Sequence, residues 1–238
     1  MKRRTFLLAL GGGALPLPLP GRWGRVLYGA DADGNNYEDI DEPMQIGTDQ
    51  DWAQVAPDTT SICGLKNDGT LLCWGSPITA LGSDDESVWE VTEPNVMGAD
   101  ISWASISAGW YFYCGLDTEG ALYCWGLGYY GTTGQGDFED SYAPTRVGDA
   151  TWLDVSTERD HACGVQSDGT LHCWGNNDLG LVLGLGDLYP NPDDMPDKVS
   201  VPTQVGSDTD WVSVEAGHEQ TCATKSSGAV YCWGYSRK

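Results

Sequence analysis

The feature that most constrains this chain is a thirteen-residue motif that occurs four times. In each copy two cysteines stand ten residues apart, and the second is followed directly by Trp-Gly. The copies are residues 63–75, 114–126, 163–175 and 222–234. A further tryptophan precedes the first cysteine of every copy by eleven residues. A fixed motif joined by spacers of variable length is typical of tandem structural repeats, whose loops tolerate insertion.

Each copy predicts a β-hairpin, because β-favouring residues flank a short polar turn that ends in glycine. The turn glycines are Gly69, Gly120, Gly169 and Gly228. The last residue of a three-residue hairpin loop takes the left-handed conformation, which glycine adopts at no steric cost. Counting outward from the turn places Leu65 opposite Leu71 and Cys63 opposite Cys73. The second of these is a non-hydrogen-bonded pair, whose Cα atoms are close enough for a disulfide.

The same count pairs every cysteine of the chain into a local disulfide. The predicted pairs are Cys63–Cys73, Cys114–Cys124, Cys163–Cys173 and Cys222–Cys232. The alternative is four pairs of buried thiols, because reduced cysteine packs well as a small hydrophobic residue. Zinc is disfavoured, because zinc sites use more closely spaced ligands. We therefore expect no metal and no cofactor.

The tryptophan after each second cysteine points to the opposite face of its strand. These residues are Trp74, Trp125, Trp174 and Trp233. A strand with large residues on both faces must be sandwiched between neighbours, as in a propeller or a solenoid. Short Pro-x-x-Val or Pro-x-x-Ile segments, which begin at Pro43, Pro144 and Pro202, predict edge strands. The sequence thus predicts an all-β, β-propeller-type array of four-stranded blades.

Residues 1–22 predict an export signal, with a basic start and an apolar stretch too short and too rich in proline to span a membrane. Arg3 and Arg4, followed by Thr-Phe-Leu, resemble the twin-arginine signal, and an ordinary secretory signal is the alternative. We expect cleavage between residues 20 and 32 and no membrane insertion afterwards. Either route leads to the periplasm, the cell surface or the extracellular space, where disulfides persist.

Residues 23–238 form the predicted repeat domain, with units near 23–75, 76–126, 127–175 and 176–234. From Trp23, which begins a degenerate Trp-Gly, to Trp233 the chain spans 210 residues, or four periods. We expect an open or strained array of four blades. The alternatives are a closed ring, which that length permits and in which residues 23–47 complete the last blade, and a fragment of a longer propeller.

These units resemble the repeats of the regulator of chromosome condensation family. The resemblance rests on Trp-x-x-Val, Cys-Gly-Leu, an Asp-Gly turn and Cys-Trp-Gly, with Ala108-Gly109, Ala216-Gly217 and His161-Ala162-Cys163 in matching places. The family's Gly-Gln-Leu-Gly loop survives only at residues 134–136. The resemblance implies a β-propeller of four-stranded blades, and cysteine at both hairpin positions resembles an exported bacterial form. Family propellers usually have seven blades, whereas this chain has four units.

Charge excludes the polyanionic partners. The chain has 35 acidic and 12 basic residues and a net charge of −23. DNA and RNA are bound through clusters of Lys and Arg, so nucleic acid and anionic membranes are excluded as partners.

No nucleophile elbow, phosphate-binding loop or metal-binding helix motif is present, and His161, His172 and His218 occupy unrelated repeat positions. We therefore predict a non-enzymatic protein-binding module. The alternative is a secreted hydrolase or lyase that uses two loop carboxylates.

The predicted binding surface lies in two long spacers, residues 127–142 and 187–198. Aromatic and acidic residues there are typical of interfaces, and insertions in repeat proteins often collect on the binding face. The candidate partner-binding residues are Trp110, Tyr129, Tyr130, Phe138, Tyr142, Tyr189, Asp193 and Asp194. The expected partner is an unidentified protein or a basic ligand. The alternative is that both spacers are solvated insertions.

Overall fold

The computed structural model describes residue 45 and residues 48–75, 91–177, 181–189, 191 and 194–235. Over these residues the protein is all-β, with strands joined by turns and loops. The predicted export signal and its cleavage range lie outside them. Within the described part of the chain, no helix is long and apolar enough to cross a membrane.

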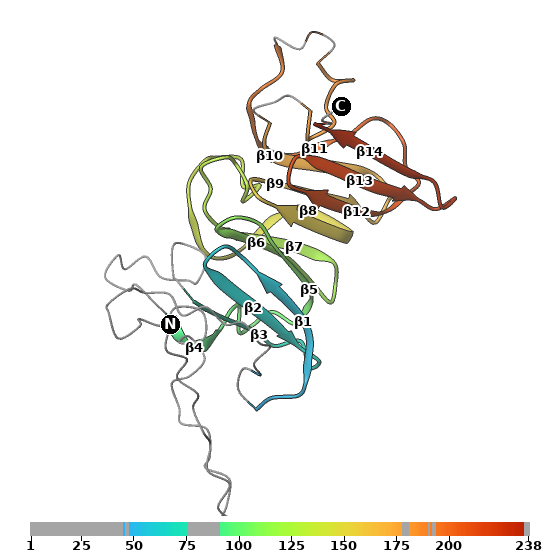
Figure 1. Ribbon diagram of the computed structural model, residues 1–238. Coiled ribbons are helices and arrows are strands. Elements are labelled where there is room, and N and C mark those ends of the chain that lie inside the picture. Colours follow the sequence, from blue (N-terminus) through green and yellow to red (C-terminus); the bar gives the residue numbers. More distant parts are fainter. Residues whose placement is uncertain are drawn as a thin grey trace, which may run out of the picture.

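The strands form four antiparallel blades that follow one another along the chain (Figure 1). The first blade contains β1 (Trp52–Pro57), β2 (Ser61–Lys66), β3 (Leu71–Gly75) and β4 (Val91–Val96). The second contains β5 (Trp103–Ala108), β6 (Phe112–Asp117), β7 (Ala121–Gly126) and the first part of β8 (Ser141–Glu158). The third contains the last part of β8, then β9 (His161–Gln166), β10 (Leu171–Asn176) and β11 (Lys198–Gln204). The fourth contains β12 (Trp211–Gly217), β13 (Gln220–Lys225) and β14 (Val230–Gly234).

Every blade begins with an inner strand that carries the first tryptophan of the repeat, and the hairpin follows. In the first three blades an outer strand then pairs with the second arm of that hairpin. This outer strand comes from the start of the next sequence unit, so the blades cut across the repeat units. Because β8 serves as the outer strand of the second blade and the inner strand of the third, these two blades share one continuous sheet.

The hairpin register is the predicted one. Leu65 pairs with Leu71 and Cys63 with Cys73, and the other three hairpins repeat the cysteine pairing. All four cysteine pairs are disulfide-bonded, and the described residues contain no free cysteine. Gly120 has a φ of 82° and its counterparts are similar, so each turn uses the left-handed conformation that glycine alone adopts freely.

The tryptophans that follow the second cysteines pack between blades, as the alternation predicts. Trp125 and Trp174 are fully buried, and Trp233 is half-buried. Trp125 lies against Tyr113 and Trp103, with ring centroids 5.7 and 5.5 Å apart. The core forms two clusters, one between the first and second blades and one that runs through the second, third and fourth.

Candidate binding face

The turns and loops that connect the strands of a blade lie alternately at its two ends, because successive strands run in opposite directions. The turn between the inner strand and the hairpin lies at the same end as the connection to the outer strand, because successive strands are antiparallel. We call this end the loop face; it carries the turns 109–111, 159–160 and 218–219 and the long connection 127–140. The opposite end, which carries the hairpin tips at Gly69, Gly120, Gly169 and Gly228, is the tip face.

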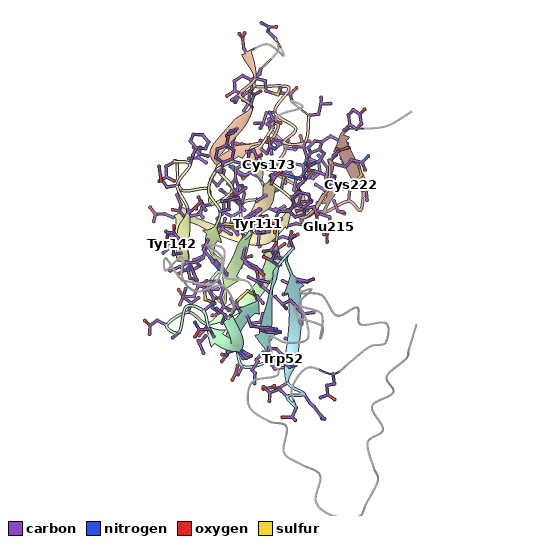
Figure 2. All side chains as sticks on the ribbon, turned by 60° about the vertical axis from the view of Figure 1, so that its left-hand side comes forward. Trp52, Tyr111, Tyr142, Cys173, Glu215 and Cys222 are labelled. Atoms are coloured by element: carbon purple, nitrogen blue, oxygen red, sulfur yellow. A yellow bond between two sulfur atoms is a disulfide. The ribbon has the colours of Figure 1, made fainter. Side chains whose placement is uncertain are left out.

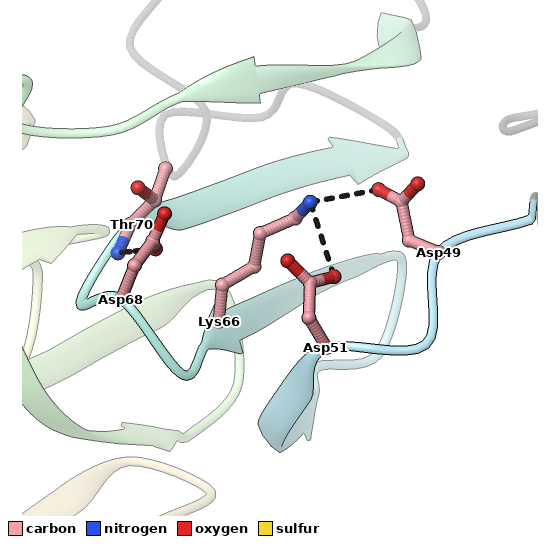
Figure 3. A network of polar contacts seen from close by, with 5 residues as sticks. All are labelled: Asp49, Asp51, Lys66, Asp68 and Thr70. Carbon is pink, nitrogen blue, oxygen red and sulfur yellow. Dashed lines mark hydrogen bonds and ion pairs between the residues drawn. The ribbon is translucent and has the colours of Figure 1, made fainter.

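Two lysines on the tip face, Lys66 and Lys225, are paired with carboxylates of their own repeat. Lys66 lies 2.8 Å from Asp49 and 3.3 Å from Asp51, at the entrance to β1 (Figure 3). The hydrogen bond to Asp49 is the main cause that raises the pKa of Lys66. In the turn that follows Lys66, Asp68 accepts a hydrogen bond of 2.9 Å from the backbone N–H of Thr70. Residues 208–225 repeat the ion pair, where Lys225 lies within 2.8 Å of both Asp208 and Asp210. These four carboxylates are therefore bound to lysines of their own repeat, although their side chains remain partly exposed.

The loop face presents exposed aromatic rings around one ammonium group. The Nζ atom of Lys198 lies 3.5 Å from the ring centroid of Tyr129, 5.0 Å from that of Tyr130 and 6.0 Å from that of Phe138. It also donates a hydrogen bond of 3.2 Å to the carbonyl oxygen of Tyr129. Tyr129 and Phe138 remain largely exposed. We call these four residues the Lys198 cluster; it is a cation–π arrangement that the chain's own lysine occupies.

The loop that carries these rings is held firmly against the third blade. Trp174 donates a hydrogen bond of 2.9 Å from Nε1 to the carbonyl oxygen of Thr132, and Thr132 and Thr133 are both buried. The N–H of Gly136 bonds to the carbonyl oxygen of Ser200 on β11 at 2.8 Å. Because the backbone is fixed at both points, the rings are pre-organised, which lowers the entropy that a partner must remove.

A second feature of the loop face is a cavity of about 280 Å³ between the turns of the third and fourth blades. Its walls include Arg159, Asp160, His161, His218 and Glu219. We call it the turn cavity. Arg159 lies 3.3 Å from Asp160 and 4.0 Å from Glu219, so both carboxylates at the cavity are engaged by one guanidinium group.

Trp110, on the second blade, contacts two residues of the cavity wall. The Arg159 guanidinium lies 5.0 Å from the centroid of the Trp110 ring, and the His218 ring meets the same ring edge-on at 6.0 Å. The N–H of Trp110 also donates to the carbonyl oxygen of Arg159 at 2.7 Å. Tyr111 and Arg159 have φ angles of 63° and 45°, a strained backbone for residues other than glycine. The turns of three blades are thus locked together around an exposed indole ring.

His161 is a structural member of the cavity wall. It is buried, and its Nε2 lies 3.2 Å from the hydroxyl of Thr221, which itself donates to the carbonyl oxygen of Val182. The Thr221 oxygen therefore accepts from an Nε2–H. Burial lowers the pKa of His161 to about 4, and the nearby His218 adds to the effect. His161 is neutral at pH 7, so Arg159 supplies the positive charge of this site.

The predicted partner-binding residues fall into separate places. Tyr129, Tyr130 and Phe138 come together, and Trp110 is exposed beside Arg159 and His218. Tyr142 is exposed at the start of β8 (Figure 2). Among the residues of the second spacer, Tyr189 packs against the core, Asp194 is exposed and accepts a hydrogen bond from Asn191, and Asp193 lies outside the described residues.

Sequence reasoning missed the residues that organise this face. Lys198 joins the two spacers, Arg159 and His218 contact Trp110, and Glu219 lies near Arg159. Adjacent blades place equivalent turns side by side, so an alignment of the four repeats by blade would have brought these residues together. No group of three or more His, Cys, Asp or Glu side chains suited to a metal ion occurs in the part of the chain that the structure describes.

The fold defines a β-propeller-type repeat protein, and the comparisons assign its repeats. Residues 103–132 and 154–180 match one family model, and residues 168–224 match another; both are described as regulator of chromosome condensation (RCC1) repeat. Within these residues the chain is therefore similar to the repeats of the regulator of chromosome condensation family. No curated protein sequence matches it.

Solved structures show the same fold at low sequence identity. The human WBSCR16 structure is 22% identical, with a TM-score of 0.71 over 87% of this chain and 55% of that one. The Saccharomyces cerevisiae Prp20p structure is 23% identical, with a TM-score of 0.65 over 77% of this chain and 45% of that one. The chain thus spans about half the length of these propellers.

Proposed function

We propose that this is an exported, non-enzymatic module that binds another protein through its loop face. The observation that carries the proposal is the contrast between the two ends of the blades. On the tip face the charges at Lys66 and Lys225 are paired within the repeat, whereas the loop face holds exposed rings at Trp110 and in the Lys198 cluster on anchored backbone. Fixed aromatic side chains with a polar rim are typical of binding hot spots.

The comparisons support binding as a general role of the fold. Solved structures include Kap60 bound to the yeast RCC1 protein Prp20, and a Prp20p structure whose description covers its binding to Gsp1p and histones. The net charge of −23 argues against nucleic acid for this chain. It favours a partner with a basic surface.

Export is supported by the cysteines. Four disulfides persist only where thiols are not kept reduced. If the protein is exported, none of its cysteines should react with an alkylating agent before reduction when it is isolated from its native compartment. Reactive thiols in that material would contradict the export proposal.

The loop-face proposal is tested by capture from the cell envelope with three proteins. We expect the wild type to retain a partner and a Tyr129→Ala/Phe138→Ala variant to lose it. Glu119→Ala changes an exposed side chain on the tip face and should bind as the wild type does. All three should melt at similar temperatures, because the altered side chains are exposed. Retention by the loop-face variant, or loss by Glu119→Ala, would contradict the proposal.

A further inference from the structure

The turn cavity combines apolar and charged residues in one wall. Its lining includes Leu181, Val182 and the aromatic residue Tyr235. Leu181 and Tyr235 are 49% and 40% exposed, so the cavity has apolar surface that the described residues leave uncovered. The rest of the lining is polar and includes the carboxylates of Asp160 and Glu219. This composition suits a side chain that has an apolar stem and a charged end.

The size of the cavity also suits a single side chain. Pockets that hold whole small molecules have volumes of about 300–1,000 Å³, and the turn cavity, at about 280 Å³, falls just below that range. It lies on the same face as the exposed ring of Trp110 and the Lys198 cluster. A side chain that projects from a protein bound to the loop face can therefore enter the cavity.

Carboxylates outnumber cations among the charged residues of the wall. Asp160 and Glu219 share one guanidinium group, that of Arg159, which leaves one negative charge unbalanced among these three residues. His161 adds no positive charge at pH 7, because burial lowers its pKa to about 4. The chain as a whole has a net charge of −23, so the wider electrostatic field also attracts cations.

Glu219 is the carboxylate best placed to bind a second cation. It lies 4.0 Å from Arg159, whereas Asp160 lies 3.3 Å from it, and the Glu219 side chain is 32% exposed against 14% for Asp160. The Arg159 guanidinium also lies on the Trp110 ring, so contacts with Asp160 and Trp110 hold it without Glu219. The Glu219 carboxylate is therefore open to a charged hydrogen bond with an incoming group.

The backbone of the wall is fixed before a partner arrives. The N–H of Trp110 donates to the carbonyl oxygen of Arg159 at 2.7 Å, and the N–H of Tyr235 donates to that of Glu219 at 2.8 Å. The φ angle of Arg159, 45°, is a strained value of the kind that clusters at functional sites. A preformed wall lowers the entropy that binding removes.

We propose that the turn cavity binds one lysine or arginine side chain of a protein partner. This inference rests on the proposed function of the loop face. The aliphatic stem of the bound side chain lies against Leu181, Val182 and Tyr235, and its cationic end pairs with Glu219, while Asp160 stays with Arg159. An acidic side chain is disfavoured, because it would enter a site that already has an excess of negative charge.

Nuclear magnetic resonance titrations of the disulfide-bonded protein test the site without a partner. The probes are the Nα-acetyl amides of arginine, lysine, citrulline and glutamate. The arginine and lysine probes should shift the His218 and Tyr235 signals until they saturate. Citrulline has nearly the shape of arginine but no charge, so its probe should bind about ten-fold more weakly or worse. Absence of binding by the two basic probes, equal binding of the citrulline probe, or stronger binding of the glutamate probe would overturn the proposal.

A pair of charge variants locates the contact. Glu219→Gln removes the proposed counter-ion at nearly constant size and should weaken binding of the arginine probe about ten-fold or more. Glu215→Gln removes the same charge from an exposed position on β12 that is not part of the lining, and it should bind as the wild type does. Wild-type affinity in Glu219→Gln, or an equal loss in Glu215→Gln, would contradict the assignment.

A third variant tests the apolar part of the wall. Leu181→Ser removes an exposed apolar side chain from the lining and should weaken binding of the arginine and lysine probes alike. Because this residue carries no charge, the result does not depend on how Glu219→Gln folds. Unchanged binding in Leu181→Ser would contradict a site that holds the stem of the basic side chain.

The same probes separate this inference from the proposed function. The Tyr129→Ala/Phe138→Ala variant alters the Lys198 cluster and should bind the arginine probe as the wild type does. Capture of a partner through the Lys198 cluster without binding of the probe would sustain the loop-face function and reject the cavity as a site for a basic side chain. Binding of the probe that depends on Glu219, together with failed capture, would support the cavity and reject the loop face as a protein-binding surface.

Discussion

The hairpins of the third and fourth blades have the same motif but differ in burial. Both contain the ten-residue disulfide loop and a tip glycine with a φ of 83° or 84°. On the second arm, however, Leu171 is buried between neighbours and Val230 is exposed. The turn and the disulfide are therefore local properties of the motif. Burial is supplied by the adjacent strand and blade.

The two tryptophans that close these hairpins give the largest expected difference. Trp174 is fully buried and donates to Thr132, whereas Trp233 is half-buried and donates to Val182. Trp174→Ala should lower the free energy of unfolding by about 3–5 kcal/mol through lost burial and a cavity. Trp233→Ala should cost clearly less. Urea unfolding of both variants measures this, and equal losses would contradict a fourth blade that is less completely packed.

The joint between the third and fourth blades should weaken in acid because of His161. Its pKa is about 4 in the folded protein and about 6.5 when unfolded, so the unfolded chain binds the extra proton between these pH values. Stability from this residue is complete above pH 6.5 and falls as the pH drops toward 4, by about 3 kcal/mol in total. Unfolding free energies at pH 7.5 and 4.5 should differ less in His161→Gln than in the wild type. An unchanged difference would show that His161 is not buried as a neutral residue.

Substitutions at the tip glycines distinguish the cost of backbone strain from the cost of a clash with the next blade. Gly169→Ala and Gly228→Ala place alanine in the same left-handed conformation, which costs about 1–2 kcal/mol in each. Only at Gly169 does the new methyl group meet the backbone of the following blade. Gly169→Ala should therefore lower the melting temperature more than Gly228→Ala does. If the two variants melt alike, the tip of the third hairpin does not contact the entrance to β12 as described.

The spacing of residues in the sequence predicted the structural features that depend on residues close together in the sequence. The pairing of Cys63 with Cys73, the left-handed Gly120 and the buried Trp125 follow from turn length and strand alternation. Contacts across blades did not follow, because they depend on which turns become adjacent. Trp110 was expected on an exposed surface, but its contacts with Arg159 and His218 come from two other blades.

In the two long spacers, too, the sequence did not predict which residues come together. Tyr129, Tyr130 and Phe138 were expected near the second spacer, and Lys198 does bring one end of that spacer to them. Tyr189 was grouped with them by composition, but it packs against the core beside the buried Leu185. The amino-acid types of these residues suit an interface. Which of them are exposed to a partner depends on how the folded loops pack against the blades.

Backbone hydrogen–deuterium exchange of residues 230–234 most directly tests the claim that a neighbouring strand supplies burial. Residues 171–175, which are already covered by β11, provide the internal reference. Residues 171–175 should exchange slowly, whereas residues 230–234 should exchange fast, because the described residues place no outer strand beside β14. Exchange of residues 230–234 that is as slow as that of residues 171–175 would contradict this claim.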